Sequence, residues 1–230
     1  PIGLAHVVPG IGGCAGDRLA ADPPVDAGGD QFARLTVGGP ELDARLADHG
    51  LGDRRQRIDE EAGQDAGEKA DLNFICTHNS RRSHMAQLWA QLAVHYYGLD
   101  NISCFSGGTE ATAFNPGAVK AMQDAGFEIA KIADAENPVY AVRFSTETGP
   151  LEAFSKKYDD TVNPATDFAA IMTCSHADEN CPLIPGATVR IPITYDDPKD
   201  FDNTPQAETK YRERVMEIGR DILYAFSQVK

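Results

Sequence analysis

From Asp71 onward, short apolar runs alternate with amphipathic stretches, and this alternation limits the folds open to the chain. Residues 72–76 are typical of a buried strand, and residues 83–97 of a helix that ends at Gly98. Strands alternating with helices predict an α/β fold, a three-layer sandwich whose four-stranded parallel sheet has helices on both faces. The other predicted elements are strands at 102–106, 168–173 and 189–193, a helix between Pro116 and Gly126, and a last helix over about 205–226.

The first 70 residues have a different composition. They contain 13 of the 21 glycines and a single aromatic residue, Phe32. Such a segment buries too little apolar surface to offset its conformational entropy. We therefore predict that residues 1–70 form a loosely ordered extension, with a small ordered cap as the alternative, ahead of a folded domain over residues 71–230. Cys14 lies in this extension and is expected to be incidental.

The formal net charge of −14 argues against nucleic acid and anionic membranes as partners, because both are bound through clusters of Lys and Arg. No run of about 18 apolar residues is present, so no membrane span is expected. The first residues lack the pattern of a secretory signal. Five cysteines without framework spacing favour reduced thiols, so we expect a cytoplasmic protein.

Three chemically active residues lie at or shortly after the ends of predicted strands. They are Cys76, Cys174 and Asp197. Ligands of parallel sheets bind beyond the carboxyl ends of the strands. We therefore expect these residues to share one site.

The loop between the first strand and the first helix has a cysteine and an arginine, Cys76 and Arg82, separated by five residues. Five residues can turn their backbone N–H groups around one anion at the positive end of the following helix. The same field favours the thiolate of Cys76. Arg82 offers a planar fork to two oxygens of the anion, and the Ser83 hydroxyl can donate to the sulfur. This pattern predicts a site for a tetrahedral oxyanion with Cys76 as nucleophile.

In the alternative interpretation, Cys76 is a buried thiol at a strand end and Arg82 a solvated residue of the first helical turn. Asn79 is expected to shape the loop because asparagine tolerates left-handed backbone geometry. The predicted oxyanion-binding residues are Thr77, His78, Asn79, Ser80, Arg81 and Arg82.

These motifs resemble the low-molecular-weight protein tyrosine phosphatase family, and most of all its thioredoxin-coupled arsenate reductase branch. The resemblance rests on the loop with its preceding strand, on residues 83–87, on Ser106-Gly107-Gly108 and on Asp197-Pro198. It covers about residues 71–230. It implies a fold of that family, arsenate or a phosphomonoester as substrate, no bound cofactor or metal, and thioredoxin as external reductant if the protein is a reductase.

Breaking the As–O or P–O bond requires a proton for the departing oxygen, and a carboxylic acid near the thiolate can supply it. The segment 194–198 contains Asp196 and Asp197 followed by proline. The family resemblance implies that Asp197 is the acid and Asp196 its neighbour. The alternative is a plain acidic turn, which Asp-Asp-Pro also favours.

The choice between phosphatase and reductase depends on Cys174 and Cys181, which follow the third predicted strand. A phosphatase needs one cysteine, whereas reduction of arsenate requires two electrons, which thiols supply by forming a disulfide. The segment resembles the redox helix of the reductases, which implies that Cys174 attacks Cys76 and that Cys181 then pairs with Cys174. Residues 175–180 are accordingly expected to be mobile.

Two other interpretations of these cysteines remain. They can be unreactive thiols in a phosphatase that works through a cysteinyl phosphate. They can also join His176 as metal ligands, although three ligands without a Cys-x2-Cys motif make a weak zinc pattern. Cys104 fits the alternating pattern of the second predicted strand, so its side chain is expected in the core.

Several positions depart from the family pattern. His78 and Arg81 add bulk and charge to the loop, and Arg81 can bind the anion or point to solvent. Gln87 replaces an acidic residue that helps some reductases to hold potassium, so no potassium site is expected. Residues 137–164 form a longer connection than in compact reductases and are expected to be a lid or a binding surface. Lys199-Asp200 replaces the aromatic pair that flanks phosphotyrosine in the phosphatase branch.

Overall fold

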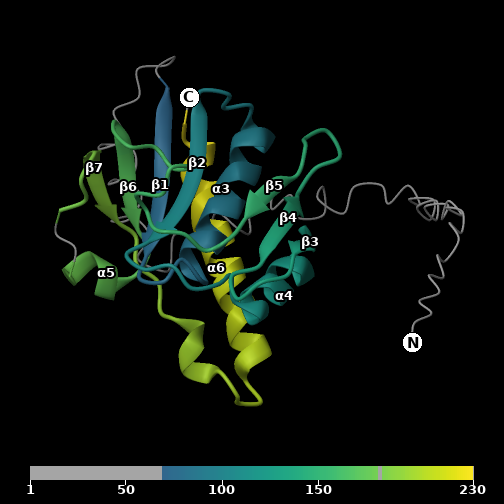
Figure 1. Ribbon diagram of the computed structural model, residues 1–230. Coiled ribbons are helices and arrows are strands. Elements are labelled where there is room, and N and C mark those ends of the chain that lie inside the picture. Colours follow the sequence, from purple (N-terminus) through teal and green to yellow (C-terminus); the bar gives the residue numbers. More distant parts are fainter. Residues whose placement is uncertain (1–68, 181–182, 230) are drawn as a thin grey trace, which may run out of the picture. The chain divides into compact units, whose positions relative to one another are not determined.

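The computed structural model describes residues 69–180 and 183–229, and it confirms the predicted parallel sheet (Figure 1). The sheet has the strand order β2-β1-β6-β7, and every pairing in it is parallel. Its strands are β1 (Ala70–Cys76), β2 (Ile102–Gly108), β6 (Phe168–Met172) and β7 (Ala187–Pro192). The helices are α3 (Arg82–Tyr97), α4 (Pro116–Asp124), α5 (Ser175–Asn180) and α6 (Ala207–Ser227), with a short 3-10 helix η1 (Pro198–Phe201).

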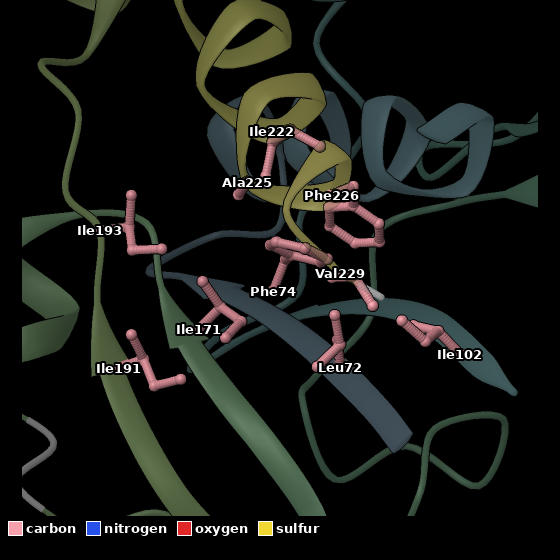
Figure 2. A pocket seen from close by; sticks show the side chains of 10 residues that line it. All are labelled: Leu72, Phe74, Ile102, Ile171, Ile191, Ile193, Ile222, Ala225, Phe226 and Val229. Atoms are coloured by element: carbon pink, nitrogen blue, oxygen red, sulfur yellow. The ribbon is translucent and has the colours of Figure 1, made fainter. Parts of the chain in front are cut away.

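Both faces of the sheet are covered, as predicted. Neighbouring residues of β1 point to opposite sides of the sheet, so their contacts show what covers each face. Phe74 lines an apolar pocket together with Ile222 and Phe226 of α6 (Figure 2). Ile75 belongs to a buried cluster on the other face that includes Ala177 of α5. The second half of β1 is therefore buried on both sides, which accounts for the apolar residues Phe74, Ile75 and Cys76 at its end.

The ends of the helices have the local signals that the sequence contains. Asn115 caps α4, its Oδ1 accepting hydrogen bonds from the backbone N of Gly117 at 2.8 Å and of Ala118 at 3.2 Å. Pro116 follows at the first helical position, where its missing N–H is not needed. Gly98 ends α3 in the left-handed conformation at φ 67°, as predicted.

A second sheet was not predicted. It is antiparallel, in the order β3-β4-β5, and its strands are β3 (Glu128–Ala133), β4 (Val139–Arg143) and β5 (Leu151–Ala153). In β3, Ile129 is the one buried residue, so the strand lacks the apolar alternation that sequence analysis relies on.

Residues 137–164, expected to be a lid or a binding surface, contain β4 and β5 and then run along the end of β2. The Gly108 N donates to the Lys156 carbonyl at 2.9 Å, and the Tyr158 N donates to the Gly108 carbonyl at the same distance. This connection therefore packs against the strand that follows α3. The predicted extension over residues 1–70 lies almost entirely outside the described residues and stays a prediction.

Among the helices of the described part of the chain, none combines the length and the apolar character that crossing a membrane requires. The longest, α6, has an amphipathic pattern. Its buried face contains Tyr211, Val215, Ile218, Ile222 and Phe226, as the spacing of three and four predicted.

Gly219 of α6 lies against the indole of Trp89 in α3. A Cβ at this position would be 2.5 Å from Trp89 Cε2. We expect Gly219→Val to lower the free energy of unfolding by about 2 kcal/mol, because overpacking a filled core outweighs the gain in helix propensity. Urea denaturation tests this, with Met216→Val at an exposed position of the same helix as the control. An unchanged midpoint for Gly219→Val would show that the two helices separate at little cost.

Candidate active site

The loop from Cys76 to Arg82 connects β1 to α3 at the carboxyl end of the sheet. Asn79, in the middle of the loop, has a φ of 44°, so the prediction of left-handed geometry is confirmed. Its Nδ2 donates to Ser83 Oγ at 2.9 Å, and its Oδ1 accepts from the backbone N of Lys156 at 2.9 Å. The buried Asn79 side chain thus ties the loop to the start of α3 and to the connection after β5.

The carbonyl groups of the loop point outward, where the surrounding chain satisfies them. The Thr77 carbonyl accepts from the Glu110 N at 2.8 Å, the His78 carbonyl from Ser155 Oγ at 2.9 Å, and the Ser80 carbonyl from the Asn115 N at 2.9 Å. Because the C=O and N–H groups of a peptide plane point in opposite directions, outward carbonyls direct the N–H groups toward the centre of the loop. An inward ring of N–H groups is suited to bind an anion.

Gly108 allows the end of β2 to approach this loop closely. A Cβ on Gly108 would be 2.6 Å from the Asn79 N and 2.7 Å from the Thr77 carbonyl oxygen. Any other residue would push the loop away from the strand. Gly108 therefore has a role in shaping the site.

Cys76 and Ser83 are adjacent, with Sγ and Oγ 3.1 Å apart, and both are buried. Ser83 Oγ already accepts a hydrogen bond from Asn79 Nδ2, so its own proton is available for the sulfur. This is the arrangement that a hydroxyl needs to stabilise a thiolate.

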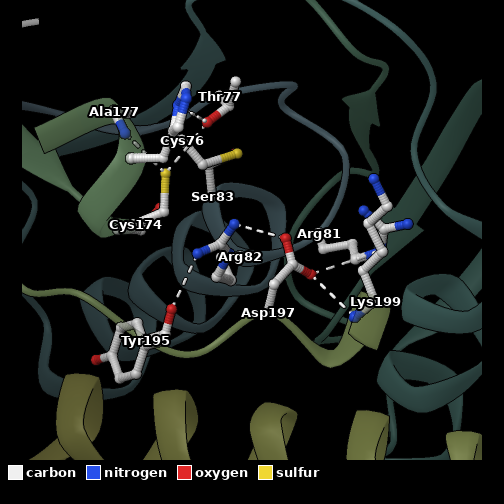
Figure 3. A network of polar contacts seen from close by, with 12 residues as sticks. Cys76, Thr77, Arg81, Arg82, Ser83, Cys174, Ala177, Tyr195, Asp197 and Lys199 are labelled. Atoms are coloured by element: carbon white, nitrogen blue, oxygen red, sulfur yellow. Dashed lines mark hydrogen bonds and ion pairs between the residues drawn. The ribbon is translucent and has the colours of Figure 1, made fainter. Parts of the chain in front are cut away.

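Asp197 lies directly beside the loop arginine (Figure 3). Arg82 Nη2 donates to Asp197 Oδ2 at 2.6 Å, and Arg82 Nη1 donates to the Tyr195 carbonyl at 2.9 Å. Asp197 also caps η1, its Oδ1 accepting from the Lys199 N at 3.1 Å. Asp196 points away, with its side chain 99% exposed. The structure thus brings Asp197, and not Asp196, to the loop.

Arg81 does not point to solvent, so that alternative is wrong. Its side chain is 11% exposed, and its Nε donates to the Tyr211 hydroxyl at 2.8 Å. Its Nη2 donates to Asp202 Oδ2 at 3.3 Å. Both partners lie more than 100 residues away in the sequence, and no local signal identifies them.

The remaining loop side chains lie at its edge. Ser80 Oγ donates to the Ala113 carbonyl at 2.7 Å, so its hydroxyl supports the neighbouring segment. His78 is 41% exposed, and its Nε2 is 3.6 Å from a carboxylate oxygen of Glu110. This pair forms part of the rim of the site.

Cys174 lies just after β6, fully buried, in the same apolar cluster as Cys76. Thr77 Oγ1 is 3.5 Å from Cys174 Sγ (Figure 3). It is also 3.3 Å from His176 Nδ1. The Ala177 N donates to Cys174 Sγ at 3.4 Å. The strand-end argument therefore placed Cys174 at the loop correctly.

Cys181 and Cys14 lie outside the described residues, so the pairing predicted for Cys181 stays a prediction. Residues 175–180 form α5, and their expected mobility is likewise untested. Cys104 is in the core, as expected, and burial raises the pKa of its thiol far above the usual range. Cys76, Cys104 and Cys174 are all free thiols.

Within residues 69–180 and 183–229, no group of three His, Cys, Asp or Glu side chains is placed to hold a metal ion. Gln87 is engaged with β2: its Nε2 donates to the Cys104 carbonyl at 3.2 Å, and its Oε1 accepts from Ser106 Oγ at 2.6 Å. The side-chain amide of Gln87 thus has a structural role, because it joins α3 to β2.

Two buried groups behind the loop were missed by sequence analysis. His84 is fully buried and stacks on Phe114 at 4.2 Å between ring centroids, and burial holds its pKa well below the usual range. Lys156 is 6% exposed, with its ammonium 4.7 Å from the centre of the Phe154 ring. Burial lowers the pKa of Lys156 to about 8.

The lowered pKa of Lys156 predicts a pH-dependent stability. An unfolded lysine titrates near pH 10.4, so between about pH 8 and pH 10.4 the unfolded chain binds more protons, and the free energy of unfolding rises with pH. Lys156→Met should remove a rise of at most about 3 kcal/mol. Urea denaturation at pH 7 to 10 measures it, with Lys157→Met at the exposed neighbouring position as the control. Equal slopes for wild type and Lys156→Met would contradict the assignment.

Comparison with known proteins agrees with this geometry. A model of the low molecular weight phosphotyrosine protein phosphatase family matches residues 71–139. An arsenate reductase of Bacillus licheniformis is 32% identical over 158 residues, which are 67% of this chain and 93% of that protein. An arsenate reductase of Halalkalibacterium halodurans is 31% identical over 155 residues, again 67% and 93%.

Among solved structures, an arsenate reductase in the phosphate binding state covers 70% of this chain and 99% of its own, with a TM-score of 0.47 and 17% identity. The matches to these two sequence relatives extend over 93% of the length of each relative. The chain therefore belongs to the family of low-molecular-weight phosphotyrosine protein phosphatases and arsenate reductases, and it is an enzyme.

Proposed function

We propose that this enzyme reduces arsenate to arsenite through a disulfide relay. The observation that carries the proposal is the buried Cys174 thiol beside the loop, 3.5 Å from Thr77 Oγ1 and in one cluster with Cys76. Hydrolysis of a phosphomonoester through a cysteinyl phosphate does not require a second thiol. A reductase requires one, because two thiols together supply two electrons.

In the proposed first step, the loop N–H groups and Arg82 bind the oxyanion. The backbone N–H groups belong to the residues of the sequence prediction: Thr77, His78, Asn79, Ser80, Arg81 and Arg82. The Cys76 thiolate attacks arsenic, an oxygen leaves as water with a proton from Asp197, and an S–As bond forms. Ser83 donates to the sulfur. Binding of the anion must draw Arg82 away from Asp197, because the same guanidinium nitrogen contacts that carboxylate at 2.6 Å.

In the second step, the Cys174 thiolate attacks Cys76 Sγ. The S–S bond forms as the S–As bond breaks, and the electron pair of that bond passes to arsenic, which leaves as arsenite. Cys181 then attacks Cys174, which frees Cys76 and leaves a disulfide between Cys174 and Cys181. A dithiol protein of the thioredoxin class reduces that disulfide. A reducing compartment such as the cytoplasm keeps all three thiols available.

The coupled assay that tests this proposal is arsenate-dependent NADPH oxidation by the purified protein with thioredoxin and thioredoxin reductase. We expect sustained turnover that requires all components. The family model favours one other function, hydrolysis of a phosphomonoester through a cysteinyl phosphate. Absence of NADPH oxidation, from protein that hydrolyses an aryl phosphate, would replace the reductase proposal with that one.

Asp197→Asn should lower kcat by about 10²- to 10⁴-fold, because an amide cannot donate the proton that the departing oxygen needs. Asp196→Asn is the matched control: its side chain is 99% exposed and should be replaceable within about twofold of wild-type kcat. Equal loss in the two variants would show that neither carboxylate is the acid, and that the segment matters only for folding.

A further inference from the structure

Arg81 and Arg82 are consecutive in the sequence, yet their side chains contact different residues. Arg82 contacts Asp197 and the Tyr195 carbonyl, whereas Arg81 turns toward α6 and the end of η1. Arg81 has no side-chain cap function at the start of α3. Its guanidinium is largely buried, so its contacts must compensate for the loss of water.

The contacts of Arg81 close into a ring of three side chains. Arg81 Nε donates to the Tyr211 hydroxyl at 2.8 Å, and that hydroxyl donates to Asp202 Oδ1 at 2.8 Å. Arg81 Nη2 donates to Asp202 Oδ2 at 3.3 Å. Tyr211 keeps its proton at working pH, because burial raises its pKa to about 12. Each member therefore fixes the other two, and we call Arg81, Asp202 and Tyr211 the lock.

The lock is connected to Asp197 through η1. Asp197 stands at the start of this four-residue helix and Asp202 directly after it, where the Asp202 N donates to the Lys199 carbonyl at 2.9 Å. Arg81 Nε is also 3.9 Å from Asp197 Oδ1 (Figure 3). Because η1 is a single short turn, holding Asp202 holds the direction of Asp197 as well.

The need for such a hold arises when the anion binds. Arg82 Nη2 contacts Asp197 Oδ2 at 2.6 Å in the structure. An oxyanion in the loop would bind the Arg82 guanidinium. The hydrogen bond from Arg82 to Asp197 would then be absent when Asp197 transfers its proton. The hydrogen bonds of the lock join side chains only, so the lock does not compete with the anion for the loop N–H groups.

We propose that Arg81, Asp202 and Tyr211 position Asp197 for proton transfer, so that Arg81 is a positioning residue for the acid whose side chain does not bind the oxyanion. The inference rests on the proposed function for the role of Asp197. It departs from the sequence prediction, which grouped Arg81 with the anion-binding residues.

Steady-state kinetics of Tyr211→Phe and Arg81→Gln test this role. We expect kcat for arsenate reduction to fall about tenfold or more, because a displaced acid loses part of its catalytic factor. The KM for arsenate and the inhibition constant of phosphate should stay within about twofold, because the loop is unchanged. Asp196→Asn is the control. Raised KM and inhibition constants with an unchanged kcat would identify Arg81 as an anion ligand and overturn the proposal.

A second measurement does not depend on turnover. Amide hydrogen exchange of a peptide covering residues 196–204 should become about fivefold faster or more in Tyr211→Phe, while a peptide from β6 keeps its wild-type rate. If wild-type protein lacks arsenate turnover, the proposed function fails, and this exchange alone decides whether the lock holds η1. Unchanged exchange in Tyr211→Phe and in Arg81→Gln would overturn the lock, whatever the activity of the enzyme.

Discussion

Replacing Cys76 with serine is expected to abolish arsenate reduction, with a loss of turnover on the order of a thousandfold or more. A serine hydroxyl is not ionised at neutral pH, and it cannot enter a disulfide, so both steps of the proposed reaction are blocked. Cys76 lies at the end of β1 with Ser83 Oγ 3.1 Å from its sulfur, a distance that an oxygen also tolerates. The variant should therefore fold normally.

Phosphate binding provides the internal control for Cys76→Ser. The loop N–H groups and Arg82 remain, so titration calorimetry should give a dissociation constant for phosphate within about threefold of wild type. Retained binding with lost turnover separates a missing nucleophile from a collapsed loop. Retained turnover would mean that another thiol makes the first attack, and it would contradict the assignment of Cys76.

Cys174→Ser is expected to stop multiple turnover as completely as Cys76→Ser does, but at a later step. The thiolate of Cys76 can still attack arsenate, yet no second thiol next to it releases arsenite. NADPH oxidation in the coupled assay should fall to background. A phosphatase would hydrolyse its cysteinyl intermediate with water and keep its turnover.

Cys104→Ala is the matched control for Cys174→Ser. It also removes a buried thiol, but from within β2, where the side chain packs in the core. We expect lower stability from the lost packing and an unchanged kcat. Normal reductase turnover by Cys174→Ser would exclude the relay, even if arsenate is the substrate.

The parallel sheet was predictable because short apolar runs alternate with amphipathic stretches, and β6 is a continuous apolar run that is buried along its whole length. The loop was predictable because its residue types and spacing lie within seven consecutive positions, between a strand and a helix. Asp197 and Cys174 required one further rule, that the carboxyl ends of parallel strands meet at one edge. These parts of the structure depend on local patterns joined by a general rule of topology.

The parts that were missed depend on contacts between distant residues. No residue near Arg81 in the sequence indicates that its side chain contacts Tyr211 and Asp202. The direction of the Arg81 side chain therefore could not be inferred. In the sequence, Lys156 cannot be distinguished from a surface lysine. In the structure it is buried, and its backbone N donates to Asn79 Oδ1. The antiparallel sheet was not predicted, because most residues of β3 are exposed and the strand therefore lacks an apolar pattern.

The central claim is that Cys76 and Cys174 together deliver two electrons to arsenate, and a single-turnover experiment tests it most directly. The fully reduced protein is mixed with one equivalent of arsenate, without thioredoxin, and both arsenite and remaining thiols are counted. The proposed relay predicts one arsenite per chain, the loss of two thiols, and a disulfide between Cys174 and Cys181 in the mass spectrum of a digest. No arsenite, with every thiol retained, would contradict it.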